Sequence, residues 1–171
     1  MSRVGDMRGL PLGGGFRYLG VLVLRSAGGS VKINDVLRGK GNQVVTISPE
    51  ATVTELLALL ADHNIGAVVV SPDGTTVSGI VSERDVVRLW NGTPEAGDVR
   101  VSAIMTSEVH TCTPDDLIDN LMRLMTDRRI RHVPVVVDGS LAGLVSIGDV
   151  VKSRIGELEF EREQLSNYIS S

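Results

Sequence analysis

A chain of 171 residues suits one compact domain or two small ones and is long enough to bury a sizeable core. Aromatic residues make up only 3% of it, so that core must be aliphatic. The net charge is −4, and it falls to −7 outside the arginine-rich first 29 residues, which disfavours general nucleic-acid binding. The single Cys112 excludes an internal disulfide, argues against a thiolate zinc site and fits a reducing compartment, with the cytoplasm as the expected location.

Residues 1–30 are rich in glycine and arginine and contain one apolar run, Tyr18 to Leu24, that is too short to span a bilayer. A signal peptide is the alternative, because Arg17 precedes that run and small residues follow it. The foldable pattern begins only at Val31. We therefore expect residues 1–30 to be a leader outside the fold, either disordered or a start-site artefact, and we expect no membrane partner.

The rest of the chain is an internal repeat. Ser48-Pro49-Glu50 aligns with Thr113-Pro114-Asp115 at an offset of 65, and a one-residue deletion then brings Gly79 onto Gly143. Upstream, Asp35-Val36-Leu37 corresponds to residues 103–105, with a longer loop in the first copy. The expected divisions are a leader (1–30), a first repeat (31–92), a second repeat (93–155) and a C-terminal helical extension (156–171), with a polar linker at 91–100.

Within each repeat the hydrophobic period changes in the order strand, helix, strand, strand, helix. This order predicts an α/β fold, α+β in some schemes, of two pseudo-twofold β-α-β-β-α units with an extended C-terminal helix. In the first repeat we expect strands at 44–47, 67–70 and 77–81, a helix opened by Ser48-Pro49 and a closing helix containing residues 86–90. In the second we expect strands at 110–112, 133–137 and 141–145, and helices at 117–128 and from residue 147 onward.

The last helix is expected to continue beyond the second repeat. Its apolar residues fall at alternating four- and three-residue spacings that Arg162 interrupts, which is typical of a coiled-coil seam, and they are Val151, Ile155, Leu158, Leu165 and Ile169. The alternative is a helix that lies on its own domain.

Each copy carries the segment Gly-aliphatic-Val-Ser-x-x-Asp, at Gly79 to Asp85 and at Gly143 to Asp149, where an apolar strand runs into a helix. The first N–H groups of a helix lack intrahelical partners and the helix dipole is positive there, so hydroxyls, carboxylates or a bound phosphate are drawn to that end. Two interpretations stay open. Ser-x-x-Asp is a capping box and can be purely structural. The return of the whole segment, with a glycine that admits a ligand or another backbone, favours a ligand site.

With these junctions and this element order, the chain resembles a stand-alone tandem pair of cystathionine-β-synthase (CBS) domains, also called a Bateman module. The resemblance covers about residues 31–155 and also rests on the segment Ile130 to Val136. The C-terminal segments Ser146 to Lys152, Gly156-Glu157 and Tyr168-Ile169 further resemble small bacterial proteins that contain little besides this pair.

The resemblance implies a receptor for an adenosine nucleotide, such as AMP, ADP, ATP or NAD(H), with no catalytic cofactor and no metal. In the family, the Asp of each junction takes the ribose diol through two charge-assisted hydrogen bonds, and the hydroxyl contacts ribose or phosphate. These roles fall on Ser82, Asp85, Ser146 and Asp149. Residues of the neighbouring strands would form the adenine slot, with specificity largely from backbone groups: Thr46, Ile47, Gly66, Ala67 and Val68 in the first copy, and Thr111, Cys112 and Val133 in the second.

The two implied sites should be unequal. Where the first copy has Gly66-Ala67 the second has Arg131 and His132, and where the first has Arg84 the second has Gly148. Arg84, Arg131 and His132 are therefore the candidates for binding phosphate, and arginine is the better bidentate partner. The alternative for Arg131 is a solvated position at a helix end.

The resemblance implies a regulatory module that signals through rearrangement of a homodimer to an unknown downstream protein. The closing helices would supply the apolar dimer surface, from Val86, Val87, Trp90, Val150, Val151, Ile155 and Leu158. The alternative is a ligand-free dimerising scaffold. An enzyme of the IMP dehydrogenase kind is not expected, because a barrel of about 250 residues does not fit the chain. The sequence also offers no Ser-His-Asp order, metal cluster or P-loop.

Overall fold

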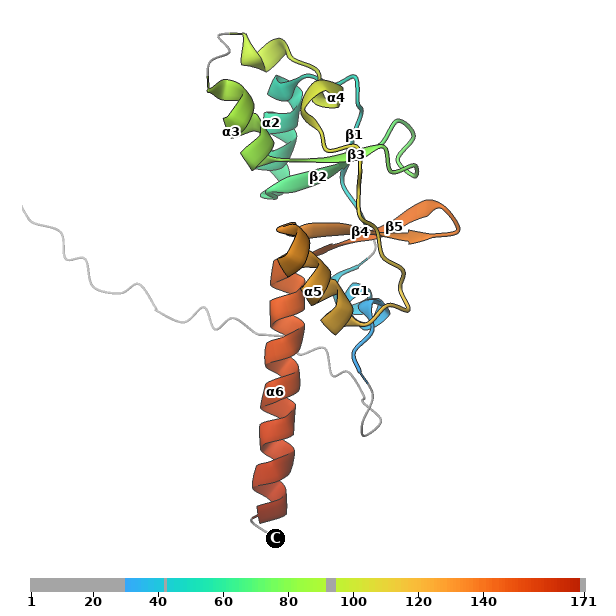
Figure 1. Ribbon diagram of the computed structural model, residues 1–171, viewed down its shortest axis with the longest axis vertical. Helices are drawn as coiled ribbons and strands as arrows, with labels where there is room; N and C mark the ends of the chain where they lie inside the picture. The colour runs from blue at the N-terminus through green and yellow to red at the C-terminus, as the bar shows by residue number, and fades with distance from the viewer. Residues whose placement is uncertain (1–29, 42, 92–94, 170–171) are drawn as a thin grey trace, which may run out of the picture.

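The computed structural model describes residues 30–41, 43–91 and 95–169, and it arranges them as two α/β units whose sheets face each other (Figure 1). The predicted mixed fold of two similar units with a long C-terminal helix is confirmed. The prediction for the leader falls on residues 1–29, which lie outside the described residues.

The first unit contains a three-stranded sheet in the order β1-β2-β3. Strand β1 pairs in parallel with β2, and β2 pairs antiparallel with β3. The elements of this unit are β1 (Thr46–Ile47), α2 (Val53–His63), β2 (Ala67–Val70), β3 (Gly79–Ser82) and α3 (Glu83–Trp90). The strand prediction for residues 67–70 is therefore confirmed, whereas β1 is shorter than expected and β3 begins two residues later.

The second unit repeats this scheme with a two-stranded sheet. Its elements are α5 (Ile118–Arg128), β4 (His132–Val137), β5 (Ser140–Ser146) and α6 (Ile147–Ile169). The strand expected at residues 110–112 is reduced to a single parallel bridge between Cys112 and Val135, at the place that β1 occupies in the first unit. Helix α6 begins at the predicted residue, passes Gly156 without a break and projects beyond the second unit (Figure 1).

The prediction that Ser48-Pro49 opens the first helix is wrong. Helix α2 begins at Val53, after the N-cap Thr52. The Thr52 hydroxyl accepts from the Glu55 N–H at 3.2 Å, and the Glu55 carboxylate accepts from the Thr52 N–H at 2.7 Å. This reciprocal capping box satisfies two helix N–H groups at once, which the proline at residue 49 cannot do, so it decides where the helix starts.

Two further helices were not predicted. Each of them packs on the unit that is formed mainly by the other repeat. Ile33 and Leu37 of α1 (Ile33–Lys40) lie in the core of the second unit. Val101 of α4 (Val101–Ile104) lies in the core of the first unit, next to the 3-10 turn Ala96–Asp98 on the linker. The two repeats therefore exchange their leading segments, and neither core is complete without chain from the other repeat.

The two sheets cover each other. On β2, Val68 and Val70 point into the core of the first unit, and both are fully buried. Ala67 and Val69 alternate with them and point to the opposite face, yet they are only 2% and 0% exposed. The second unit lies over that face (Figure 1), and a backbone hydrogen bond of 2.8 Å from Leu141 to Thr75 ties the two hairpins together.

The glycine that opens each junction segment has a steric reason. A Cβ atom on Gly79 would lie 2.6 Å from Sδ of Met105 and 3.1 Å from the carbonyl oxygen of Thr106. A Cβ atom on Gly143 would lie 2.7 Å from Cδ2 of Leu37. Each glycine therefore admits the leading segment that the other repeat supplies. The sequence had left open a ligand or a second backbone, and the structure places protein atoms there.

These contacts predict a ranking of two variants. Gly79→Ala should lower the free energy of unfolding by about 1–3 kcal/mol, because overpacking must move Met105 and also the backbone at Thr106, which exchanges two hydrogen bonds with Ile80. Gly143→Ala should lower it by less, because its methyl group meets only the end of a leucine side chain. Urea unfolding of the two variants checks this, and a larger loss for Gly143→Ala would contradict it.

Candidate functional site

The first junction lies where β3 runs into α3. Ser82 pairs with Ala67 across the sheet, and the Glu83 N–H donates to the Gly66 carbonyl at 3.1 Å. The Asp85 Oδ2 atom accepts from the Ser82 N–H at 2.9 Å and from the Ser82 hydroxyl at 2.7 Å. The structure thus brings together Ser82, Asp85 and the Gly66-Ala67 segment, which sequence reasoning had assigned to one site.

The second junction, between β5 and α6, has the same geometry. Ser146 pairs with His132, and the Ile147 N–H donates to the Arg131 carbonyl at 2.8 Å. Asp149 Oδ2 accepts from the Ser146 N–H at 2.8 Å and from its hydroxyl at 2.7 Å, and the Asp149 N–H donates to the Ser146 hydroxyl at 3.3 Å. Both aspartates therefore cap helices, as one interpretation of the motif predicts.

Capping and ligand binding are compatible in this geometry. In both junctions the bonds to serine converge on Oδ2 of the aspartate. Both carboxylates are partly exposed, at 19% for Asp85 and 21% for Asp149. A carboxylate oxygen accepts more than one hydrogen bond, so a capped aspartate can still accept from a hydroxyl of a bound molecule.

Sequence reasoning missed one residue of the second junction. The Lys40 ammonium, at the end of α1, lies 2.7 Å from Asp149 Oδ2 and donates to the Leu144 carbonyl at 3.2 Å. Partial burial alone would raise the pKa of Asp149, but the hydrogen bonds from Lys40 and Ser146 outweigh burial and hold that pKa below its usual value. Only the exchange of leading segments brings Lys40 here, and that exchange left no local sequence signal.

Positive charge gathers around the second junction. The pKa of His132 is lowered by burial and then by the charges of Lys40 and Arg131, and Asp149 opposes these effects. Arg131 and His132, two of the three predicted phosphate ligands, therefore lie in one electrostatic cluster. The third, Arg84, is an exposed residue on the first turn of α3, in the other unit.

The structure sorts the predicted adenine-slot residues by their surroundings. Four of them turn their side chains into a unit's own core: Ile47, Val68, Cys112 and Val133. Ala67 is buried on the opposite face, towards the other unit, while Thr46 and Gly66 are half-buried and Thr111 is exposed. A slot at these positions would meet the four core residues through backbone atoms, and recognition largely through backbone groups is what the resemblance to CBS domains implied.

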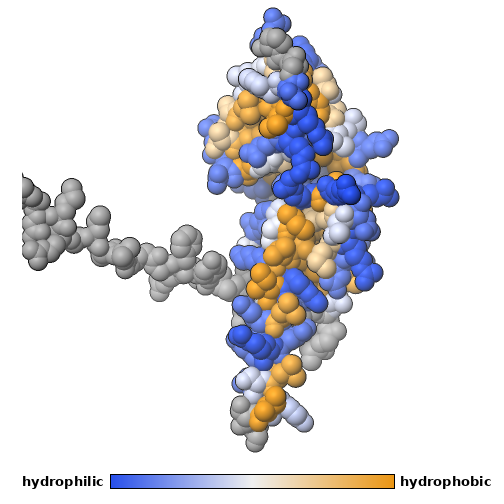
Figure 2. Space-filling view, turned by 60° about the vertical axis from the view of Figure 1, so that its left-hand side comes forward, coloured by the Kyte–Doolittle hydropathy of each residue, from blue (hydrophilic) through white to orange (hydrophobic). Residues whose placement is uncertain are grey.

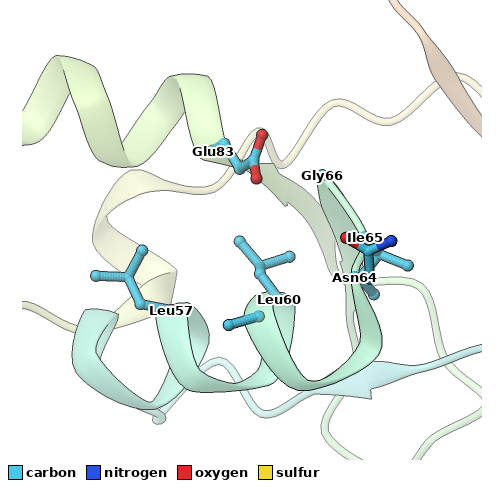
Figure 3. A pocket seen from close by; sticks show the side chains of 7 residues that line it. Leu57, Leu60, Asn64, Ile65, Gly66 and Glu83 are labelled. Atoms are coloured by element: carbon cyan, nitrogen blue, oxygen red, sulfur yellow. The ribbon is translucent and has the colours of Figure 1, made fainter. Parts of the chain in front are cut away.

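A hollow of about 420 Å³ lies between α2 and α3 of the first unit (Figure 3). Leu57 and Leu60 face Glu83 across it, and Gly66 forms part of its rim. At the positions matching Leu57 and Glu83 the second unit has Met122 and Ile147, which pack against its core. Glu83 is smaller and more polar than Ile147, which leaves this space less filled in the first unit. The serines and aspartates of the capping boxes are not among the residues that line the hollow.

Two further features bear on function. Among the described residues, no helix combines the length and apolarity needed to cross a membrane. In the same part of the chain, no three His, Cys, Asp or Glu side chains are grouped so that they could hold a metal ion.

Two α/β units with duplicated, capped strand-to-helix junctions define a tandem-repeat architecture, and comparison with known proteins identifies the family of the repeated domain. The family model "CBS domain" matches residues 33–92 and 101–156, so the chain belongs to the CBS-domain family. The match covers both repeats and confirms the resemblance that the sequence suggested.

Individual relatives support this assignment. The crystal structure of the CBS-domain protein ATU1752 from Agrobacterium tumefaciens is 44% identical, with a TM-score of 0.71, over 77% of this chain and 98% of that one. The mitochondrial CBS domain-containing protein CBSX3 of Arabidopsis thaliana is 37% identical over 82% of this chain and 72% of its own length. The CBS pair of protein MJ0100, solved with 5′-methylthioadenosine and S-adenosyl-L-methionine, shares the fold at 23% identity and a TM-score of 0.66, over 75% of this chain and 99% of that one.

The buried thiol yields a prediction. Burial, helped by the charge of Asp116, raises the pKa of Cys112 to about 12, and the residue is only 7% exposed. At pH 8 roughly one thiol in ten thousand would then be ionised, and the thiolate is the reactive form. A disulfide reagent such as DTNB should therefore label the folded protein many times more slowly than the protein in urea. Equal rates would contradict the core position of Cys112.

Proposed function

We propose that this protein is a non-catalytic sensor that binds an adenosine nucleotide, among AMP, ADP, ATP and NAD(H), in the cleft between its two CBS repeats, at the strand-to-helix junction of each repeat. The observation that carries the proposal is the duplicated junction, in which a partly exposed carboxylate is held at a helix start beside the first residues of the neighbouring strand. The adenosine-containing ligands of the MJ0100 pair support it, because that pair shares the fold.

The proposed chemistry at each junction is recognition of a ribose. The 2′- and 3′-hydroxyls of a ribose are adjacent donors, and an ionised carboxylate offers two oxygens that can accept from both. Asp85 and Asp149 would hold the diol, while Ser82 and Ser146 keep the carboxylates in place and contact ribose or phosphate. The helix dipole adds a favourable field for the negative charge of the ligand.

The rival functions lack comparable support. A ligand-free scaffold would need only the caps, whereas Lys40 and Arg131 add positive charge around the second junction, where a phosphate would offset it. For an enzyme, the matched family model and the relatives described above name CBS domains and no catalytic domain. We also propose a cytoplasmic location, for which the single buried thiol remains the argument.

We further propose that two copies pair through α3 and α6. Val86 and Val150, which were expected on this surface, are instead 5% and 1% exposed and belong to the cores of the two units. Val87 and Trp90 on α3 are 69% and 56% exposed, and the five apolar residues of the predicted seam on α6 are each about half exposed or more: Val151, Ile155, Leu158, Leu165 and Ile169. Figure 2 shows apolar side chains gathered along α6. Their spacing of four and three residues, interrupted at Arg162, is what a facing helix of a second copy accommodates. Nucleotide binding would then be reported to a downstream protein through this dimer.

Charge-neutral variants of the two aspartates test the ribose role. The amide oxygen of asparagine can still accept from serine, so Asp85→Asn should cost about 1 kcal/mol of stability or less. The loss of a charged double acceptor should weaken nucleotide binding at that site by about 10- to 150-fold. The melting temperature without ligand should change little, while the rise caused by nucleotide shrinks.

Asp149→Asn should change stability and nucleotide affinity by different amounts from Asp85→Asn, because it also removes the ion pair with Lys40. Calorimetric titration with AMP and NADH, beside thermal melting of the same samples, separates affinity from stability. Variants that both bind these nucleotides as tightly as the parent would show that the aspartates are caps only.

The dimer has its own test. Sedimentation at micromolar concentration should show a dimer for the parent, and Leu158→Lys should shift it towards monomer, because an exposed apolar contact becomes charged. Val137→Lys, at a 41% exposed apolar position on β4 outside α3 and α6, is the matched control and should leave the dimer intact. A parent that sediments as a monomer with and without nucleotide would contradict the proposal.

A further inference from the structure

Lys40 reaches the second junction because α1 is one turn longer than its counterpart α4. The two leading segments align at an offset of 68, which pairs Ile33 with Val101, and both side chains are fully buried. Helix α4 ends at Ile104, the counterpart of residue 36, whereas α1 continues to Lys40. The extra turn of α1 carries the Lys40 ammonium to Asp149. Among the described residues, helix α4 lacks the corresponding turn and so brings no such group to the first junction.

The two carboxylates are consequently in different states. Asp149 Oδ2 accepts from its own serine and from the Lys40 ammonium at 2.7 Å. Asp85 Oδ2 accepts from its own serine, and the ion pair between Arg88 and Asp85 is longer, at 3.8 Å, and involves Oδ1. A ribose hydroxyl that approaches Asp149 therefore competes with a bound ammonium.

The surroundings of Lys40 favour an anion as its second partner. Lys40 pairs with Asp149, and the charges of Lys40, Arg131 and Asp149 all act on His132 beside them. One carboxylate cannot balance two cations, whereas a phosphate group with up to two negative charges can. The Lys40 side chain is 43% exposed and has a flexible stem, so its ammonium can move a short distance without leaving a buried charge behind.

We infer that Lys40 changes partners when a ligand binds at the second junction. In the free protein its ammonium binds the Asp149 carboxylate. When a nucleoside phosphate binds, the ammonium moves to the phosphate and the ribose diol takes its place at Asp149. The inference rests on the proposed function. It assigns a ligand class to the second junction, namely phosphorylated adenosines rather than adenosine itself. An uncharged nucleoside would have to displace the ammonium and would offer it no new partner. The first junction should discriminate less.

The test measures AMP and adenosine affinities at each junction separately, in the full chain, from the backbone amide signals of Ser146 and Ser82 in ¹⁵N-resolved NMR spectra. In Lys40→Met, AMP binding reported by Ser146 should weaken by about 10- to 150-fold, the effect of losing one charge-assisted hydrogen bond. Adenosine binding there should stay the same or tighten, so the preference for AMP collapses.

Two controls accompany this variant. The Ser82 signal reports the other junction in the same sample, and its ratio of AMP to adenosine affinity should not change. Arg38→Met removes a positive charge from an exposed position of the same helix and should leave both ratios as in the parent. The dispersion of the amide spectrum verifies that each variant is folded.

The outcomes separate the two claims. If the parent binds neither compound at either junction, the proposed function and this inference are both wrong. If the parent binds AMP but Lys40→Met keeps the same ratio at Ser146, the sensor function stands and the role of Lys40 is wrong. A collapse of the ratio at both junctions, or its reproduction by Arg38→Met, would also overturn the assignment, because the effect would then come from overall charge.

Discussion

The two junctions depend on one physical constraint, which is that a helix starting directly after a buried strand has N–H groups without partners. In both units an aspartate three residues into the junction meets this need by accepting from the preceding serine. The same requirement places an ionised carboxylate at the sheet edge, beside the strand that begins with Ala67 or His132. A structural necessity thereby creates the acceptor that a ribose diol requires.

The exchange of leading segments turns two separate units into one body. Helix α1 completes the core of the second unit and α4 that of the first, and both glycines that open the junction segments are needed to admit them. Lys40 ends α1, and the chain then runs on to β1 of the first unit. A ligand that displaces Lys40 from Asp149 thus breaks a contact at the end of the helix from which the chain passes into the first unit.

Much of this organisation was predictable, because strong hydrophobic periods repeat at a constant offset. Strands β2 and β4, helix α5 and the start of α6 lie within about one residue of their predicted positions, and so do the two Ser-x-x-Asp caps. What failed was non-local or depended on competing signals. The Thr52–Glu55 capping box overrode the proline signal, as reciprocal capping does. Helix α1 is stabilised by a core that its own repeat does not build, so neither its existence nor the contact between Lys40 and Asp149 could be read from neighbouring residues.

The central claim is that a capping aspartate also holds a ribose, and a crystal structure grown with AMP tests it most directly. The account predicts that the ribose diol lies within hydrogen-bond distance of the carboxylate of Asp85 or Asp149, with the cap from the adjacent serine still formed. It further predicts that wherever AMP occupies the second junction, the Lys40 ammonium has left Asp149 for the phosphate. AMP bound elsewhere on the protein, or both junctions empty at saturating AMP, would contradict the account.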